Sequence, residues 1–252
     1  MSEAVYEASY KVRIADANAH AHLKLTALFE MLQEAATEHA QKLGVDFSQL
    51  QPLGLGWVLS KMSIELENLP MWNERVFIKT WPSVRDRITT CREFVAHGAD
   101  AARLFTARSQ WAIFDTHTRR LARLDKIRLW DKIDDKFANN STFEKHLRRP
   151  SPEAHGVRCY TRKDDIDLNG HVNNSVYIAL ALQPVPTEFV DAHEPRRIQI
   201  AFLEEIRPED TVLSKYEQDD ACTTVHSIIN EGTGRECARI NIDWTAAKGE
   251  KA

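Results

Sequence analysis

Residues 16–44, DANAHAHLKLTALFEMLQEAATEHAQKLG, combine a polar opening with the clearest helical pattern in the chain. From Leu25 to Leu43 apolar side chains return every three or four positions, which places them on one face of a helix. Gly44 follows the last of them, and glycine readily adopts the left-handed conformation that ends helices. The pattern therefore predicts one amphipathic helix over 25–43.

A series of short segments rich in Val, Ile, Thr, Trp and Phe follows this helix. Such composition is typical of strands, and turn-forming residues separate the segments. A helix with one apolar stripe buries that stripe when an antiparallel sheet curls around it. The pattern predicts an α+β unit with four strands after the helix, at 57–67, 75–81, 87–97 and 103–115.

The same order of elements returns in the second half of the chain. A short strand is expected near 157–163 and a helix over 174–182, followed by four more strand-like segments. DLNGH at 167–171 precedes this helix as DANAH at 16–20 precedes the first, which indicates duplication. Two such units side by side are expected to join into one larger sheet, because this hides exposed strand edges.

Residues 139–155 separate the two units. They include a polar run at 139–142 and the stretch RRPSP at 148–152, which have the composition of a linker. The predicted organisation is a first unit over 1–138, a linker over 139–155 and a second unit over 156–252.

Overall composition excludes several classes of protein. Hydrophobic residues make up 43% and charged residues 28%, as in ordinary globular proteins. No segment approaches the roughly 20 apolar residues of a membrane-spanning helix, and residues 1–13 lack the apolar core of a signal peptide. A cytoplasmic location is therefore expected. The net charge of −4 argues against a general nucleic-acid-binding surface.

The four cysteines show no CxxC or other spacing typical of metal ligands. Buried free thiols are expected rather than disulfides or zinc ligands. Neither a metal ion nor another cofactor is expected. The cysteines are Cys91, Cys159, Cys222 and Cys237.

Asp167, Asn169 and His171 offer a carboxylate, an amide and an imidazole at two-residue spacing. In an extended segment these side chains would point the same way, and the first backbone N–H groups of the following helix would lie beside them. This set suits hydrolysis of an acyl thioester by activated water, with the helix amides as an oxyanion site. A purely local role is the alternative, because Asp and Asn often form turns and cap helices.

The stretch DIDLNGHVNNSVYIALALQPVP at 165–186 resembles the acyl-acyl carrier protein (acyl-ACP) thioesterases of plants and bacteria. In that family the motif Asp-x-Asn-x-His-Val-Asn-Asn-x-x-Tyr begins the second hotdog helix. The likeness extends to residues 28–45, 57–83 and 108–124. It implies tandem hotdog domains, each a long helix wrapped by a curved antiparallel sheet. It also implies hydrolysis of fatty acyl-ACP to free fatty acid and carrier protein.

The resemblance also implies catalytic roles for Asp167, Asn169 and His171. A Glu on a later strand completes the family's site, and the run IQIAFLEEIR places it at Glu205, with Glu204 one residue away. Many plant members carry a Cys after this Glu.

Here that position is Ile206, so attack by water without a cysteine nucleophile is favoured. Asn169 and His171 are expected to orient the water. Either Asp167 or Glu205 is expected to act as its base.

The first half carries a degenerate copy of this site. Leu69 stands where the second half has Glu205, so Asp16, Asn18 and His20 are expected to be non-catalytic. The resemblance implies that this half shapes an acyl tunnel, with the added segment 44–56. The candidate substrate-binding residues are Phe29, Met31, Trp57 and Met62, together with Asn173 and Asn174 at the start of the second helix.

The expected partner is acyl carrier protein with its phosphopantetheine-linked acyl chain. The family docks this acidic protein on a positive surface, and basic residues flank the motif. Solvated surface charge is the alternative explanation for these residues. The candidate docking residues are Arg119, Arg120, Arg123, Arg158, Arg162 and Lys163.

Three other functions remain open from the sequence. An acyl-CoA thioesterase would use the same chemistry on a different carrier, and a non-catalytic module would only bind acyl thioesters. A hydratase with a His and an acid is a weaker alternative. No GxSxG, HExxH, P-loop or GxGxxG motif indicates another enzyme class. The chain is expected to be a monomer of two hotdogs or a homodimer.

Overall fold

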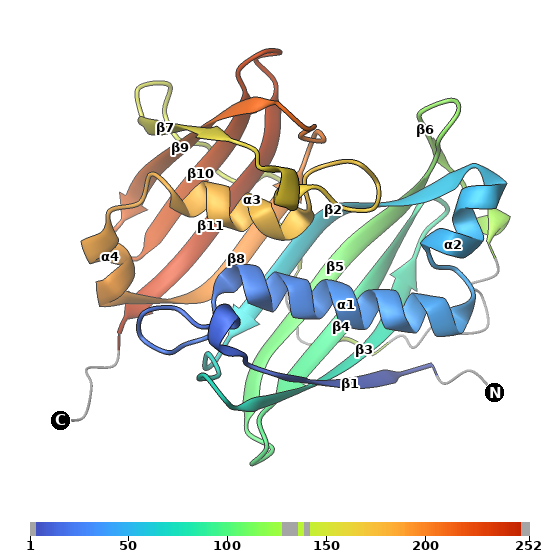
Figure 1. Ribbon diagram of the computed structural model, residues 1–252, viewed down its shortest axis with the longest axis horizontal. Coiled ribbons are helices and arrows are strands. Elements are labelled where there is room, and N and C mark those ends of the chain that lie inside the picture. Colours follow the sequence, from blue (N-terminus) through green and yellow to red (C-terminus); the bar gives the residue numbers. More distant parts are fainter. Residues whose placement is uncertain (1–3, 128–135, 139–141, 248–252) are drawn as a thin grey trace. The chain divides into compact units, whose positions relative to one another are not determined.

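The computed structural model describes residues 4–127, 136–138 and 142–247. The chain divides into two compact units, Met1–Thr142 (unit 1) and Phe143–Ala252 (unit 2), each an antiparallel sheet with a helix packed against it (Figure 1). Most of the predicted linker, from residue 143 on, therefore groups with unit 2. The expectation that the two sheets join into one stays a prediction. Within the described part of the chain, no helix has the length and apolar character needed to cross a membrane.

Unit 1 has the strand order β1-β3-β4-β5-β2, with every neighbouring pair antiparallel and β6 paired to β5. In the described part of unit 1, the short 3-10 turns η1 (Ile14–Asp16), η2 (Gln51–Leu53) and η3 (Leu124–Lys126) connect these elements. Its elements are β1 (Tyr6–Lys11), α1 (Leu25–Leu43), α2 (Phe47–Leu50), β2 (Leu55–Leu66), β3 (Arg75–Arg85), β4 (Thr89–His97), β5 (Arg103–Asp115) and β6 (Arg120–Ala122).

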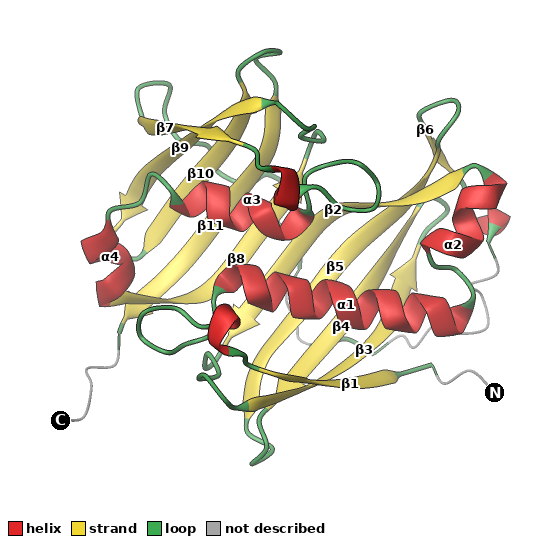
Figure 2. Ribbon diagram, in the orientation of Figure 1, coloured by secondary structure: helices red, strands yellow, loops and turns green. Residues whose placement is uncertain are grey.

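Unit 2 repeats this topology with the strand order β7-β9-β10-β11-β8 (Figure 2). Each strand takes the place of its counterpart in unit 1, so the predicted succession of strand, helix and four strands is confirmed in both halves. Its elements are β7 (His155–Tyr160), the 3-10 turn η5 (Lys163–Asp165), α3 (Asn174–Leu182), α4 (Thr187–Ala192), β8 (His193–Phe202), β9 (Thr211–Asp220), β10 (Thr223–Asn230) and β11 (Glu236–Ala246).

Helix α1 begins and ends where the apolar pattern predicts. Gly44 ends it with φ at +70°, the left-handed conformation in which glycine avoids the strain of a Cβ. The side chains that repeat along the helix, including Leu28, Leu32 and Ala35, are fully buried. Burial of this stripe against the sheet stabilises unit 1.

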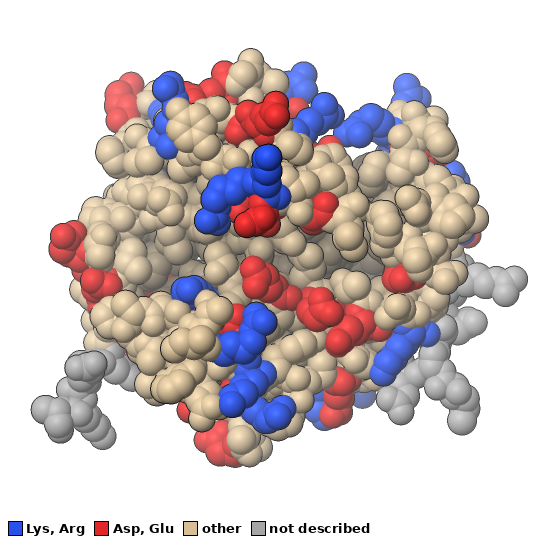
Figure 3. All heavy atoms as spheres, in the orientation of Figure 1, with Lys and Arg blue, Asp and Glu red and all other residues tan. Residues whose placement is uncertain are grey.

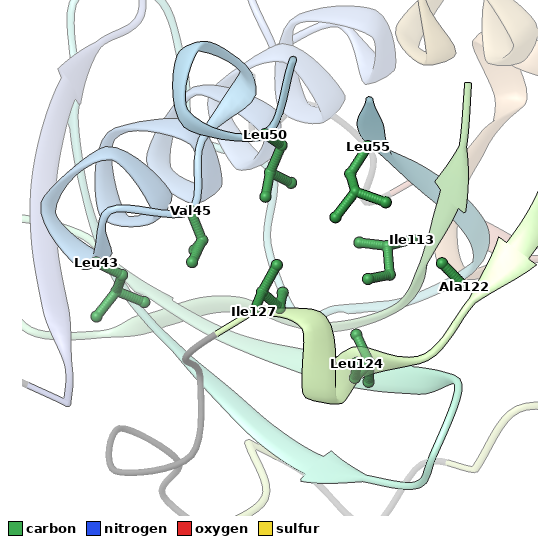
Figure 4. Close-up of a cluster of buried hydrophobic side chains, with 8 residues drawn as sticks. All are labelled: Leu43, Val45, Leu50, Leu55, Ile113, Ala122, Leu124 and Ile127. Atoms are coloured by element: carbon green, nitrogen blue, oxygen red, sulfur yellow. The ribbon is translucent and has the colours of Figure 1, made fainter. Parts of the chain in front are cut away.

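The added segment 44–56 packs into a hydrophobic cluster of its own (Figure 4). Its helix α2 lies beside the start of β2 and brings apolar side chains against those of β5, β6 and η3. This cluster closes one end of unit 1. Its members are Leu43, Val45, Leu50, Leu55, Ile113, Ala122, Leu124 and Ile127.

The chain between the repeats is bound to the outer faces of the sheets, the faces opposite the helices. In unit 1, the backbone N–H of Ala138 donates to Glu93 Oε2 at 3.1 Å. In unit 2, Arg239 Nη1 donates to the carbonyl of Leu147 at 3.1 Å, and Arg149 forms an ion pair with Glu236 at 2.7 Å. Residues 143–152 therefore have the composition of a linker but are held to the sheet by hydrogen bonds and an ion pair.

Candidate active site

Asp167 organises a tight turn just before α3. Its Oδ1 accepts hydrogen bonds from the backbone N–H of Asn169 at 2.8 Å and of His171 at 3.4 Å. Its Oδ2 accepts from the Asn169 side-chain amide at 3.2 Å. Gly170 has φ at +77°, which the reversal of the chain requires. The prediction of an extended segment is therefore wrong, because the carboxylate bends the backbone around itself.

His171 lies next to Glu205. His171 Nε2 is 3.2 Å from Glu205 Oε2, and about a quarter of each side chain is exposed, 26% and 27%. The backbone N–H of Val172 donates to the Ile206 carbonyl at 2.9 Å and holds the two segments together. The structure thus unites the His with the Glu that lies more than thirty residues later in the chain.

Tyr177 braces the segment that carries Glu205. Its hydroxyl accepts from the backbone N–H of Ile206 at 3.0 Å and donates to the Glu204 carbonyl at 3.4 Å. Tyr177 therefore binds the backbone on both sides of Glu205. The side chain is buried, and this burial raises the pKa of the phenol well above its ordinary value. Tyr177 was missed as a site residue, although it closes the Asn-Asn-x-x-Tyr part of the motif.

The two adjacent glutamates take different partners. Glu204 Oε1 is 3.4 Å from Arg235 Nη1, whereas Glu205 is beside His171. The backbone N–H groups of Leu203 and Glu204 both donate to the Cys237 carbonyl, at 2.8 and 3.1 Å, which fixes this register. The geometry therefore favours the predicted Glu205 over Glu204.

The first turn of α3 has fewer available amides than the sequence suggests. Asn173 caps the helix, because its Oδ1 accepts from the Ser175 N–H at 3.0 Å. The Asn173 N–H donates to the Asp165 carbonyl at 2.8 Å, and the Val176 N–H donates to the Asn173 carbonyl. Among the residues that the structure describes, no hydrogen bond engages the N–H of Asn174. That group is the candidate oxyanion donor.

No cysteine is poised as a nucleophile in this site. All four cysteines are free thiols, but the expectation that they are buried is wrong for the exposed Cys222 and the half-buried Cys91. The position after Glu205 is the fully buried Ile206. Cys237 is the one whose backbone contacts the glutamate segment. Burial raises the pKa of its thiol to about 11, so the nucleophilic thiolate is scarce at neutral pH.

The segment before α1 repeats this turn with different residues. Asn18 Oδ1 accepts from the backbone N–H of His20 and of His22, both at 2.9 Å, as Asp167 does from the residues two and four positions later. Asp16 instead accepts from the Arg13 N–H at 2.9 Å. This reproduces, in unit 1, the contact of Asp165 with the Arg162 N–H at 2.8 Å.

The predicted alignment of the two motifs is therefore wrong by two residues. Matching Asp-x-Asn-x-His by letters pairs DANAH at 16–20 with DLNGH at 167–171, but the hydrogen bonds match different positions. Asn can replace Asp in this turn because both side chains present an oxygen to backbone N–H groups. The structure pairs Asp16 with Asp165, Asn18 with Asp167, His20 with Asn169, and His22 with His171.

In unit 1 a leucine stands at the position of the acid. The Leu23 N–H donates to the Pro70 carbonyl at 2.8 Å, the counterpart of the bond between Val172 and Ile206. Leu69 therefore occupies the position of Glu205. By the same alignment the buried Leu28 replaces Tyr177. Unit 1 has neither the carboxylate nor the tyrosine that holds its segment.

The candidate tunnel residues all belong to unit 1. Phe29 and Met31 are buried on α1, and Met62 is buried on β2. Trp57 is half-buried, donates from Nε1 to the Val45 carbonyl at 2.8 Å and packs edge-on against Trp111. These contacts suit core residues as well as tunnel walls, so the tunnel stays a prediction.

The candidate docking residues are exposed and divide equally between the units. Several have acidic neighbours: Arg158 pairs with Glu231 at 2.6 Å, and Arg162 pairs with Asp165 at 3.2 Å. Lys and Arg lie among Asp and Glu on the visible face of both units (Figure 3). A docking role for them stays a prediction.

Comparisons with known families decide where the chain belongs. A model of the acyl-ACP thioesterase N-terminal domain matches residues 3–128, and one of the C-terminal domain matches residues 151–246. The chain belongs to the acyl-ACP thioesterase family. The resemblance stated from the motif is confirmed.

Relatives in this family are distant in sequence. Oleoyl-acyl carrier protein thioesterase 2 of Arabidopsis thaliana is 28% identical over 224 residues, which cover 82% of this chain and 61% of the relative. Thioesterase 1 of the same plant is 27% identical and covers 91% and 66%. The chain thus spans less than two thirds of the length of these relatives.

Solved structures share the fold. An acyl-ACP thioesterase from Bacteroides thetaiotaomicron superposes with a TM-score of 0.88 at 23% identity, covering 96% of this chain and 98% of the other. A 12:0-ACP thioesterase from Umbellularia californica gives 0.89 at 20% identity, covering 98% and 99%. The predicted α+β fold of tandem hotdog domains is confirmed.

Proposed function

We propose that this protein hydrolyses the thioester of fatty acyl-ACP to free fatty acid and carrier protein. The observation that carries the proposal is the 3.2 Å approach of His171 Nε2 to Glu205 in a member of the acyl-ACP thioesterase family. An imidazole beside a carboxylate, partly open to solvent, is suited to activating water. The site belongs to unit 2, and unit 1 lacks the equivalent acid.

Glu205 is the better placed of the two candidate bases. Both oxygens of Asp167 already accept hydrogen bonds within the turn, which leaves that carboxylate the role of shaping the backbone around His171. Glu205 instead faces the imidazole. In the proposed reaction Glu205 removes a proton from water, and His171 orients Glu205 and the water molecule.

The water oxygen then bonds to the thioester carbon while the carbonyl electrons move to oxygen. The Asn174 N–H at the start of α3 and the exposed Asn169 amide are the proposed donors to this oxyanion. When the intermediate collapses, the C–S bond breaks and the proton passes from Glu205 to sulfur. The products are a carboxylic acid and the free thiol of the carrier's phosphopantetheine.

The remaining parts of the proposal concern the substrate. Unit 1 would hold the acyl chain, with Phe29, Met31, Trp57 and Met62 as candidate walls. The basic side chains named above would receive the acidic carrier. A cytoplasmic location and the choice between monomer and homodimer stay predictions.

Hydrolysis of a panel of acyl-ACP and acyl-CoA substrates, followed by release of free thiol, tests this function. Asp167→Ala and His171→Ala serve as controls. Efficient hydrolysis of acyl-ACP, lost in His171→Ala, supports the proposal. Preference for acyl-CoA would reassign the carrier, and thioester binding without turnover would make the chain a non-catalytic module. Unchanged activity in both variants would remove the site.

A further inference from the structure

A cluster of polar side chains lies buried beneath α1 in unit 1. His39 on the helix is only 1% exposed, and Arg92 on β4 is 8% exposed. Arg92 Nη1 is 3.0 Å from His39 Nδ1 and 3.3 Å from Thr80 Oγ1, which is also fully buried. Since arginine only donates, His39 accepts at Nδ1. The guanidinium of Arg92 is thus buried between α1 and the face of the sheet that α1 covers.

This cation has no described counter-ion. The ion pairs among the residues that the structure describes include none to Arg92. Its neighbour Glu93 lies on the opposite face of β4, bonded to Ser83 and Arg108. Burial lowers the pKa of Arg92 to about 10, so it remains charged at neutral pH. Burying a charge without an opposite partner is costly, and its presence here calls for a compensating role.

Thr90 supplies a second, independent sign of an incomplete site. It is 6% exposed and two residues before Arg92 on β4, so both side chains point to the α1 face. Its hydroxyl has no hydrogen-bond partner among the described residues. The bonds of Arg92 to His39 and Thr80 both leave from Nη1, so no described contact engages its Nε or Nη2. Buried polar groups are normally satisfied, so the unpaired hydroxyl of Thr90 points to a ligand.

Two candidate tunnel residues border this cluster. Met62 is paired across the sheet with Ser109, which is paired in turn with Arg92. In the next row Trp111 is paired with Thr90, and Trp57 packs edge-on against Trp111. Residues paired across neighbouring strands share a face, so donors and apolar walls line the same inner surface.

We propose that Thr90 and Arg92 form a polar subsite that binds an oxygen carried on the acyl chain, as a hydroxyl or keto group. The inference rests on the proposed function, because it takes unit 1 to hold that chain. A chain oxygen would accept from the Arg92 guanidinium and satisfy the Thr90 hydroxyl. A plain hydrocarbon at the same place would leave the Thr90 hydroxyl without a partner and offer no further acceptor to the Arg92 guanidinium, so the site discriminates against it.

The test compares acyl-ACP substrates of one chain length that are plain or carry a single hydroxyl or keto group, moved stepwise along the chain. The expected result is one position at which kcat/KM exceeds that of the plain chain by about tenfold, the gain of roughly one well-placed hydrogen bond to a charged donor.

Three variants of β4 locate the preference. Thr90→Val keeps the shape and removes the hydroxyl, and Arg92→Met removes the cation. Each is expected to lower the ratio of oxygenated to plain turnover toward one. Cys91→Ala is the matched control, because this residue lies between the two but on the opposite face, and it should keep the ratio.

The outcomes separate the two proposals. Turnover of plain chains with no preference at any oxygen position overturns the subsite and leaves the thioesterase function intact. Absence of all turnover overturns the function. In that case calorimetric binding of free hydroxy fatty acids against plain fatty acids, in wild type and Thr90→Val, judges the subsite. Tighter binding of the hydroxy acids, lost in Thr90→Val, supports it, and equal affinities overturn it. If Arg92→Met does not fold, the same two readouts on Thr90→Val decide.

Discussion

Two adjacent residues with identical side chains, Glu204 and Glu205, face different surroundings. Only Glu205 is beside His171, whereas Glu204 is beside Arg235. Glu205→Gln is expected to lower kcat by about a hundredfold or more, the usual range for loss of a general base. Glu204→Gln should stay within a few-fold of wild type. Steady-state kinetics on acyl-ACP decides, and comparable losses in both variants would refute the assignment.

The proposed role of Tyr177 is to hold the backbone on both sides of Glu205. Tyr177→Phe removes the acceptor of the buried Ile206 N–H, so unfolding free energy should fall by about 1–3 kcal/mol. The loosened Glu205 should lower kcat with little change in KM, because Tyr177 lies outside unit 1, the proposed acyl-binding half. Denaturant unfolding and kinetics measure the two effects. A stability loss with unaltered kcat would reduce Tyr177 to a structural role.

The sequence predicted the residues of the site better than their geometry. Glu205 could be placed because the segment that carries it resembles the family, and Leu69 because the turns before β3 and β9 align. The expected strand is wrong for Glu205, since β8 ends at Phe202 and Glu205 lies in the connection to β9. The orientation of Asp167 could not be predicted, since its carboxylate accepts hydrogen bonds from two backbone N–H groups and so bends the chain into a turn. The role of Tyr177 could not be predicted, because its hydroxyl contacts backbone groups, and such contacts leave no recognisable pattern of side chains in the sequence.

At the scale of elements, helices α1 and α3 were predicted nearly to the residue, whereas the short helices α2 and α4 were not predicted. The period of buried side chains and Gly44 bound α1, and Asn173 caps α3. The repeat register failed for a physical reason: Asn18 and Asp167 make the same turn, so matching letters is a poor guide to matching hydrogen bonds. Roles copied between repeats must follow the backbone.

A buried histidine joins α3 to the sheet of unit 2. His226 Nδ1 donates to the Ala181 carbonyl at 2.9 Å, and its Nε2 accepts from Thr224 Oγ1 at 2.8 Å. The Thr224 hydroxyl accepts in turn from Trp244 Nε1. Burial lowers the pKa of His226 to about 4, so the imidazole is neutral in the folded protein.

This histidine makes stability depend on pH. Its folded pKa lies below its unfolded value of about 6.5, so the unfolded chain binds the extra proton between these values. Unfolding free energy should therefore fall by about 3 kcal/mol as pH drops from about 6.5 to 4. Urea unfolding across this range measures it. His226→Gln should flatten the decline, and an equal slope in the variant would contradict the prediction.

At the scale of the whole molecule, two related turns leave one proposed site. His22 and His171 occupy equivalent positions, but only His171 is beside a carboxylate. His22→Ala should keep kcat within a few-fold, whereas His171→Ala should lower it by about a hundredfold or more. The two variants are measured with the same acyl-ACP. Equal losses would show that unit 1 takes part in the chemistry.

The proposed docking of acyl carrier protein concerns exposed charges of the surface. Arg120→Glu and Lys163→Glu together reverse one exposed charge in each unit. If acidic carrier docks there, KM should rise several-fold for acyl-ACP and remain near wild type for a small thioester. Added salt should weaken the wild-type preference for the carrier substrate. Equal effects on both substrates would remove these residues from docking.

The segment between the repeats sets where the protein can be divided. The carbonyl of Leu147 accepts a hydrogen bond from Arg239, and Arg149 and Arg239 both form ion pairs with Glu236. A fragment that begins at residue 156, the predicted start of the second unit, would lose these partners and expose a row of charges on the back of its sheet. Half-molecules for expression, or a circular permutation that opens the chain here, should therefore keep residues 143–152 attached to unit 2, which carries the proposed site.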